Sequence, residues 1–265
     1  MIKSEIIKEI LSTAVMGQNM ICYDEVDSTN TVLRKLAGEG AVSGTLVTAE
    51  TQTSGRGRRG RTWLSLKGSS ILMSLLIRPD FEPEKARMLT IIMALSVAQA
   101  VEKSTELKAF IKWPNDIVVN NKKVTGILTE MILNKTTGPY VIIGTGINVN
   151  AEDFPDEIKD IATSLKKESG KIESREEIIA YTMNCFEENY NKFLKAGNLS
   201  LIKKEYESFL VNKDKEVMVL GEKEPYKGTA LGIDNEGELL VKDTEGKVNK
   251  IYAGEVSVRG LYGYV

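Results

Sequence analysis

The sequence contains no histidine among its 265 residues and only two cysteines, Cys22 and Cys185. Without histidine, a Ser-His-Asp triad, a Cys-His catalytic pair and any zinc site with an imidazole ligand are excluded. The two cysteines form no Cys-x-x-Cys motif, so a disulfide framework and a cysteine-rich metal site are excluded as well. We expect two core thiols in a cytoplasmic protein, and no metal site built from its side chains.

The sequence also lacks a long apolar run and an excess of charge of one sign. Lys and Arg number 35 against 37 Asp and Glu, so the net charge is −2 and a globally basic nucleic-acid-binding protein is not expected. The most apolar stretch, 88–101, is shorter than the roughly 20 residues that a membrane-spanning helix needs. The first residues mix charges and lack the apolar region of a signal peptide. We therefore expect neither a membrane segment nor a targeting signal.

Two kinds of periodicity divide the chain near residue 212. Before it, apolar spacing and capping residues predict helices, and β-rich runs predict strands. The helices are expected over 2–12, from one of several possible N-caps at 27–30 to about 38, and over 84–103, 174–196 and 199–210. The strands are expected over 21–26, 45–51, 70–78, 109–112, 116–120, 123–133 and 140–149. After it, five short β-rich runs are separated by glycines, which is typical of a small barrel. The sequence thus predicts an α+β domain over 1–212 and a small β-barrel over 213–265.

A glycine- and arginine-rich segment follows the strand over 45–51. Four arginines fall within six residues and alternate with glycines: Arg56, Arg58, Arg59 and Arg61, with Gly55, Gly57 and Gly60. Arginine offers a planar fork of donors that fits phosphate and carboxylate groups, and glycine lets backbone N–H groups approach an anion. A solvated surface loop and a nucleic-acid patch are the alternatives. An anionic nucleotide or acyl phosphate fits better, and without it we expect the loop to be mobile.

Two further segments carry polar residues at suggestive spacing. Lys112-Trp-Pro-Asn-Asp116 is followed, across a predicted turn at Asn120-Asn121-Lys122, by Lys123 and Gly126. A hairpin there would bring Asp116 and Lys123 toward one pocket, whereas an ordinary turn with an exposed lysine is the alternative. Gly144-Thr-Gly146-Ile-Asn148 only superficially matches a dinucleotide fingerprint, because the third glycine and the following helix are missing. No phosphate-binding P-loop motif is present either.

Taken in order, these segments resemble the biotin protein ligases. Five elements match over roughly 20–260: Asp27-Ser28-Thr29-Asn30, the Gln52–Arg61 loop, Lys112–Asp116 with Lys123 and Gly126, Gly144–Asn148, and Gly254-Glu-Val-Ser-Val-Arg259. The resemblance implies a mixed-sheet catalytic domain of the biotin/lipoate ligase type, followed by a small SH3-like β-barrel. Many bacterial relatives carry an N-terminal winged helix-turn-helix, for which too few residues precede Ser28 here. The monofunctional form, or a truncated chain, is therefore expected.

The resemblance implies an enzyme that activates biotin with ATP and Mg²⁺ to biotinyl-5′-AMP. It would then transfer biotin to a lysine of a biotin carboxyl carrier protein. A lipoate or octanoate ligase is the alternative from the same superfamily, and a nucleic-acid-binding protein is the alternative from another class. DNA is not an expected partner of this form, nor is a membrane, and a homodimer is left open.

The same resemblance assigns roles residue by residue. The residues expected to bind biotin are Ser28, Thr29, Asn30, Gln52, Gly55, Arg56, Gly57, Arg58, Lys123 and Gly126. The residues expected to bind the nucleotide are Arg58, Arg61, Trp63, Asn115 and Asn148. Lys123, Arg58 and Asp116 are expected to act in catalysis. Lys123 would neutralise the carboxylate and the α-phosphate, Arg58 would retain the intermediate, and Asp116 would orient the incoming lysine.

Overall fold

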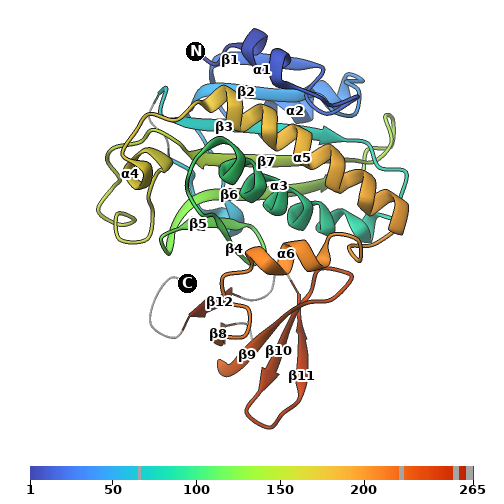
Figure 1. Cartoon of the computed structure of the whole chain (residues 1–265). Helices are drawn as coiled ribbons and strands as arrows, with labels where there is room; N and C mark the ends of the chain where they lie inside the picture. Colours follow the sequence, from blue (N-terminus) through green and yellow to red (C-terminus); the bar gives the residue numbers. More distant parts are fainter. Residues whose placement is uncertain (65–66, 221–223, 253–256, 261–264) are drawn as a thin grey trace.

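The structure is a computed structural model that describes residues 1–64, 67–220, 224–252, 257–260 and 265. The chain forms a large mixed sheet covered on both faces, and below it a smaller antiparallel sheet (Figure 1). The elements of the first part are, in order, α1 (Ser4–Ile10), β1 (Met20–Val26), α2 (Thr29–Gly38), β2 (Leu46–Gln52), η1 (Arg58–Gly60), β3 (Ser70–Ile77), η2 (Pro83–Arg87), α3 (Met88–Ser104), β4 (Phe110–Lys112), β5 (Asp116–Val119), β6 (Lys122–Ile132), β7 (Tyr140–Asn148), α4 (Leu165–Ser169), α5 (Arg175–Ala196) and α6 (Lys203–Phe209). The predicted mixed α+β architecture is therefore confirmed.

The large sheet has seven strands in the order β1-β2-β3-β7-β6-β5-β4. β1 and β2 are parallel, with α2 as their crossover, and the other neighbours are antiparallel. All eight residues of β3 are buried, as expected for a central strand covered on both faces. Each strand therefore presents alternate residues to two different layers.

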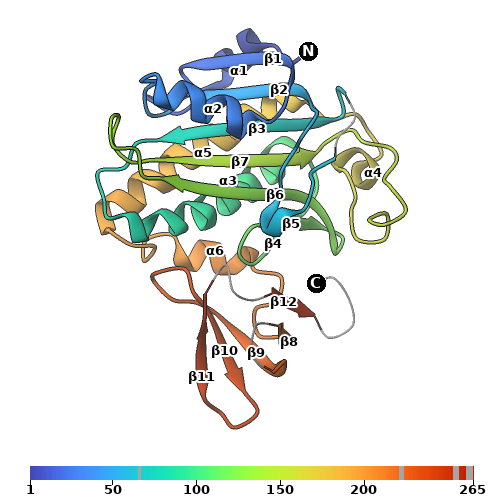
Figure 2. The same cartoon turned by 180° about the vertical axis from the view of Figure 1, so that it is seen from behind.

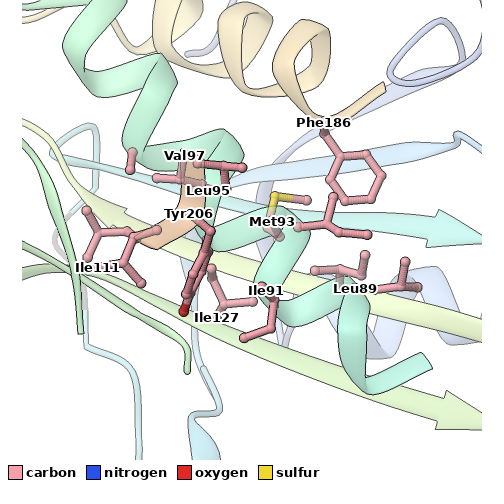
Figure 3. Packing of buried hydrophobic residues seen from close by; sticks show 14 of the residues in the cluster. Leu89, Ile91, Met93, Leu95, Val97, Ile111, Ile127, Phe186 and Tyr206 are labelled. Atoms are coloured by element: carbon pink, nitrogen blue, oxygen red, sulfur yellow. The ribbon is translucent and has the colours of Figure 1, made fainter. Parts of the chain in front are cut away.

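The core lies between the sheet and the two long helices α3 and α5. Most residues of α3 are buried, because the sheet, α5 and α6 surround it. Figure 3 shows the α3 side chains gathered with Phe186 of α5 and Tyr206 of α6. Burial raises the pKa of Tyr190, which also lies in this layer, to about 12. The apolar packing of this face leaves the opposite face of the sheet to carry polar chemistry.

The opposite face is only partly covered by a helix. α2 lies over β2, β3 and β7, where Leu33 and Ala37 pack in a small core of their own. Figure 2 shows this face, with α2 over one part and the segment around η1 over another. The remaining surface of β3, β7 and β6 faces a cavity.

The smaller sheet consists of β8 (Glu216–Leu220), β9 (Tyr226–Ile233), β10 (Leu239–Asp243), β11 (Val248–Ile251) and β12 (Ser257–Gly260). Its strands are antiparallel in the order β11-β10-β9-β8-β12, and they correspond to the short runs that the glycine punctuation predicted. The turn between β9 and β10 contacts the first part of the chain. There Trp113 Nε1 donates to the carbonyl of Gly237 at 2.9 Å, and Arg87 pairs with Glu238 at 2.9 Å. Residues 254–256, part of the last matched motif and of the predicted final strand, lie outside the described residues.

Several local predictions are confirmed and two differ in detail. Asn120 and Asn121 both have positive φ, so they form the predicted hairpin turn, while Lys122 already pairs with Val119. The helix predicted over 84–103 begins as the 3-10 turn η2, and the helix predicted over 199–210 begins only at Lys203. No helix in the described ranges is long and apolar enough to cross a membrane.

Candidate active site

A cavity of about 760 Å³ lies on the face of the sheet opposite α3 and α5. Strands β3, β7, β6 and β5, the start of α2, the end of β2, the arginine-rich segment and residues 151–162 all contribute to its wall. All candidates from the sequence except Gly55 line it: Ser28, Thr29, Asn30, Gln52, Arg56, Gly57, Arg58, Arg61, Trp63, Asn115, Asp116, Lys123, Gly126 and Asn148. The structure thus brings together residues that are up to 120 positions apart in the sequence.

One end of the cavity is polar and held by the sheet. Ser28, Thr29 and Asn30 stand at the start of α2 and are each buried. The backbone N–H of Thr29 donates to Oε1 of Gln52 at 2.8 Å, and the Thr29 hydroxyl lies 3.0 Å from the same oxygen. These groups are donors and acceptors without formal charge. They suit a neutral polar head group of a ligand.

Glycines on β6 and β7 leave room for the side chains that shape the cavity. A Cβ at Gly144 would lie 2.3 Å from Oδ1 of Asn30, and one at Gly146 would lie 2.4 Å from the Trp63 ring. A Cβ at Gly126 would lie 2.9 Å from the same ring. The Trp63 ring therefore lies against the backbone of β6 and β7, where a planar ligand ring can pack beside it.

The arginine-rich segment folds back on itself over the cavity. Arg56 and Thr62 form an isolated antiparallel bridge, and the N–H of Gly57 donates to the carbonyl of Arg61 at 2.7 Å. Arg58 reaches inward, where its guanidinium donates to Oδ1 of Asn115. Burial lowers the pKa of Arg58 and the neighbouring charge of Arg59 acts in the same direction, while the Asp116 carboxylate opposes both. Because a guanidinium remains protonated in proteins, Arg58 supplies a partly desolvated positive charge.

Lys123 and Asp116 face each other across the β5–β6 hairpin, as the spacing predicted. Nζ of Lys123 lies 2.7 Å from Oδ1 of Asp116, which also accepts from Asn115 at 2.9 Å. The Lys123 N–H donates to the carbonyl of Ile161 at 2.8 Å, and its carbonyl accepts from Thr163 at 2.9 Å. The Lys123 ammonium is therefore fixed on a braced strand, 5.8 Å from the centre of the Trp63 ring. A group this well held can neutralise negative charge that forms at a defined point.

The positions that sequence reasoning missed or misread are explained by tertiary contacts. Gly55 lies behind the described wall, where a Cβ would come 2.5 Å from the carbonyl oxygen of Trp63, so it serves close packing. Lys112, the first residue of the Lys112–Asp116 motif, lines the cavity although no role was expected of it, and Phe154 lines it although no motif contains it. Ser74 and Glu130 bond Asn30 from β3 and β6. Alternation along the strands could have placed Ser74 on this face, but nothing local marks Glu130.

Carboxylates do not cluster in the cavity. In the described part of the chain, no group of three or more Cys, Asp and Glu side chains is placed to hold a metal ion. The carboxylates that line the cavity are Asp116 and Asp153. A cation bound here would need most of its oxygen ligands from a substrate and from water.

A mixed sheet with a two-ended polar and cationic cavity, joined to a small antiparallel sheet, defines a ligase of the biotin/lipoate type. Residues 23–148 match the Biotin/lipoate A/B protein ligase family, and residues 214–259 match the Biotin protein ligase C terminal domain. The bifunctional ligase/repressor BirA of Bacillus subtilis (strain 168) is 42% identical over 250 residues, 94% of this chain and 76% of that protein. The chain belongs to the biotin protein ligase family.

Further relatives agree with this assignment. The biotin--[acetyl-CoA-carboxylase] ligase of Mycobacterium tuberculosis is 29% identical and matches over 88% of this chain and 86% of its own. The biotin protein ligase from Aquifex aeolicus in complex with biotin and ATP superposes with a TM-score of 0.81 at 37% identity, covering 92% of this chain and 99% of that one. The predicted recognition, fold class and enzyme class are thereby confirmed.

Proposed function

We propose that this enzyme joins biotin to ATP, forming biotinyl-5′-AMP, and then transfers biotin to a lysine of a biotin carboxyl carrier protein. The observation that carries the proposal is the single cavity with a neutral polar end at Thr29 and Gln52 and a cationic side at Arg58 and Lys123. Biotin needs both: a neutral ureido head and a charged carboxylate. The Aquifex aeolicus relative, determined with biotin and ATP, supports the same pair of substrates.

In the first half-reaction, a biotin carboxylate oxygen attacks the α-phosphorus of ATP. The new O–P bond forms as the bond to the β-phosphate oxygen breaks, and pyrophosphate leaves. The two reacting groups are both anionic, so their approach must be compensated by fixed positive charge. We assign to Lys123 the neutralisation of the carboxylate and α-phosphate, and to Arg58 a hydrogen bond to the intermediate. Positioning and charge neutralisation suffice for this step, which needs no histidine.

In the second half-reaction, the neutral amine of the carrier lysine attacks the acyl carbon of the mixed anhydride. The C–O bond to AMP breaks as the amide forms, AMP leaves with the bonding electron pair, and the attacking nitrogen gives up one proton to the leaving phosphate or to water. Asp116 is our candidate for orienting that amine. Asp116 accepts from Lys123 in this structure, so its role follows a shift of Nζ from the carboxylate to the phosphate, while the Lys123 backbone stays braced.

The remaining assignments follow the walls of the cavity. Ser28, Thr29, Asn30 and Gln52 belong to the biotin end, with Gly126, Arg56 and Gly57 toward the carboxylate. Trp63 and Asn148 belong to the adenine, and Asn115 and Arg61 to the triphosphate. Mg²⁺ takes oxygen ligands and keeps water, so ATP would carry it and Asp116 or Asp153 could complete its shell. We also propose the domain boundary near residue 212, between the end of α6 and the start of β8.

The test is a labelling assay with the purified protein, a biotin carrier domain, ATP and either biotin or lipoate. The proposal expects ATP-dependent labelling of one carrier lysine with biotin and none with lipoate. Labelling with lipoate alone would assign the chain to the other ligase class. Absence of both, with tight retention of oligonucleotides, would favour the nucleic-acid alternative.

A further inference from the structure

Glu130 is a carboxylate on β6 that the proposed reaction does not use. Its Oε2 accepts from Nδ2 of Asn30 at 2.7 Å, and its Oε1 accepts from the Arg34 guanidinium at 2.8 Å. Because a carboxylate only accepts hydrogen bonds, the amide nitrogen of Asn30 must face Glu130. The amide oxygen of Asn30 must then face the other way, toward Ser74.

From Asn30, a chain of four oxygen atoms leads to the polar end of the cavity. Oδ1 of Asn30 lies 2.5 Å from Oγ of Ser74, which lies 2.7 Å from Oγ1 of Thr29, which lies 3.0 Å from Oε1 of Gln52. The far end is an acceptor too, because Oε1 of Gln52 already accepts from the backbone N–H of Thr29 at 2.8 Å. Both terminal amides are therefore fixed with their oxygens pointing into the chain.

This row of four hydrogen-bonding oxygen atoms holds one proton too few. It has three oxygen–oxygen contacts, each of which requires one proton, but only the hydroxyls of Ser74 and Thr29 supply protons, one each. The two hydroxyl protons can fill only two of the three contacts. In every such arrangement the Thr29 proton points either to Gln52 or to Ser74. Toward the cavity, Thr29 can then offer only lone pairs.

Bulk water cannot readily repair this deficit. Thr29, Asn30 and Ser74 are at most 4% exposed, and only Thr29, Asn30 and Gln52 of the chain reach the cavity wall. The close approach of Asn30 to the sheet also depends on Gly144, whose absent Cβ would clash with the amide oxygen. When Ser74 donates to Asn30 and Thr29 donates to Ser74, the contact left without a proton is the one between Thr29 and Gln52 at the cavity wall. There one ligand N–H can donate to both oxygens.

We propose that Glu130 is a positioning residue that makes the site selective for a ligand head group bearing an N–H donor. This inference rests on the proposed function, in which the ligand is biotin, whose cyclic urea carries two N–H groups. The dithiolane head of lipoate has no N–H and could not supply the missing proton. Glu130 acts through Asn30, without touching the ligand, by keeping the chain short of one proton.

The variant Glu130→Gln removes this constraint. An amide at position 130 can donate, so Asn30 can turn and donate to Ser74, Ser74 to Thr29, and Thr29 to Gln52. The chain is then complete without a ligand, and Thr29 loses one accepting position. We expect the Kd for biotin, measured by titration calorimetry, to rise about tenfold, a loss of one hydrogen bond's worth of affinity. The KM for ATP should stay unchanged.

Arg34→Met is the matched control, because it removes one of the two guanidinium groups beside the same carboxylate but leaves an acceptor beside Asn30. It also leaves in place Arg56, whose guanidinium lies 3.9 Å from Oε2 of Glu130. It should change the biotin Kd less than threefold. Methylation of the biotin ureido nitrogens should weaken binding to the wild-type enzyme about tenfold. The same methylation should weaken binding to Glu130→Gln much less, because the two changes remove the same hydrogen bond. A merely structural role for Glu130 would instead make the losses additive.

Equal losses in Glu130→Gln and Arg34→Met, or wild-type affinity in Glu130→Gln, would overturn the inference. If Glu130→Gln does not fold, Glu130→Asp keeps the acceptor and should bind within threefold of wild type, and a tenfold loss there would overturn it. Wild-type protein that binds no biotin would overturn the proposed function and the inference with it. Wild-type protein that binds biotin normally while Glu130→Gln is unaffected would overturn the inference alone.

Discussion

The two sides of the cavity are built by different means. The polar end consists of buried groups on β3 and the first turn of α2 with the half-buried Gln52 of β2, held by the sheet and by one another. The cationic side depends largely on a loop in which the Arg56 side chain is 43% exposed and few backbone hydrogen bonds reach the sheet. A preorganised end costs little to bind, whereas a loop can move and close. The comparison suggests that head-group recognition precedes loop closure.

Lys123→Ala offers the strongest way to break this comparison, because Lys123 is the one proposed catalytic cation carried by a strand. Loss of its charge should slow adenylate formation about 10²- to 10³-fold, equivalent to about 2.7–4 kcal/mol, while the fold stays intact. Pyrophosphate release measures the rate. Lys122→Ala, in the same hairpin but exposed, is the matched control. A folded Lys123→Ala enzyme that releases pyrophosphate at the wild-type rate would reject the assignment.

Arg58→Gly tests the loop side. It removes a charge-assisted contact worth roughly 1.5–3 kcal/mol and adds backbone freedom. Biotinyl-AMP should then escape about 10- to 150-fold faster. The measurement is biotin labelling of a bystander protein that is not a carrier.

The control for Arg58→Gly is Arg59→Gly. Arg59 has a φ of 57°, so glycine fits its backbone, and its side chain is exposed. Unchanged bystander labelling by Arg58→Gly, with normal carrier labelling, would remove Arg58 from the site.

Trypsin digestion sharpens the comparison directly. The loop should be cut at Arg58–Arg61 in the apo protein, and biotin with ATP should slow this cleavage at least about threefold because ordering must be offset by ligand contacts. Cleavage after Lys135, in a distant exposed turn, serves as the internal reference. Equal loop cleavage with and without ligands would show that the loop does not close.

Acid should weaken the strand that carries Gln52. Glu50, two residues before Gln52 on β2, is buried, which by itself would raise the pKa of its carboxyl, but bonds from Arg175 and the Ile2 N–H lower the pKa below 4.5 overall. A lowered folded-state pKa contributes stability that is present above the unfolded value and lost as the pH falls through the folded value. The free energy of unfolding should therefore decline below about pH 4.5.

Glu50→Gln is the variant that checks this titration. It should be less stable at pH 7, because Arg175 loses its partner, but its stability should depend less on pH below 4.5. Urea unfolding at several pH values measures both. Parallel pH profiles for wild type and Glu50→Gln would show that another group is responsible.

Local chemistry made much of the fold predictable. Asn120-Asn121 predicted a hairpin because both residues tolerate positive φ, and Ser174 predicted a helix start because its hydroxyl caps the N–H of Glu177. The hairpin in turn brings the side chains of Asp116 and Lys123 together. These signals depend only on residues close in sequence.

Contacts between distant segments were not predictable in the same way. Gly144 and Gly146 suggested a weak nucleotide fingerprint, whereas their places are explained by Asn30 and Trp63 lying on the strand. Glu130 carries no local signal either, because its bonds to Asn30 and Arg34 of α2 join residues about 100 positions apart. The reason is physical: which side chain fills a glycine's space is decided by packing, and no local pattern records it.

The hydrogen bond from Trp113 to the carbonyl of Gly237 limits how the two parts of the chain can vary in sequence. The β9–β10 turn of the smaller sheet buttresses the Lys112–Asp116 segment, which carries Asn115 and Asp116 into the cavity. The smaller sheet is thus not freely exchangeable, even though its strands pair only with one another. A chimera that grafts this sheet from a relative should retain ligase activity only if its turn presents a carbonyl to Trp113 and a carboxylate to Arg87.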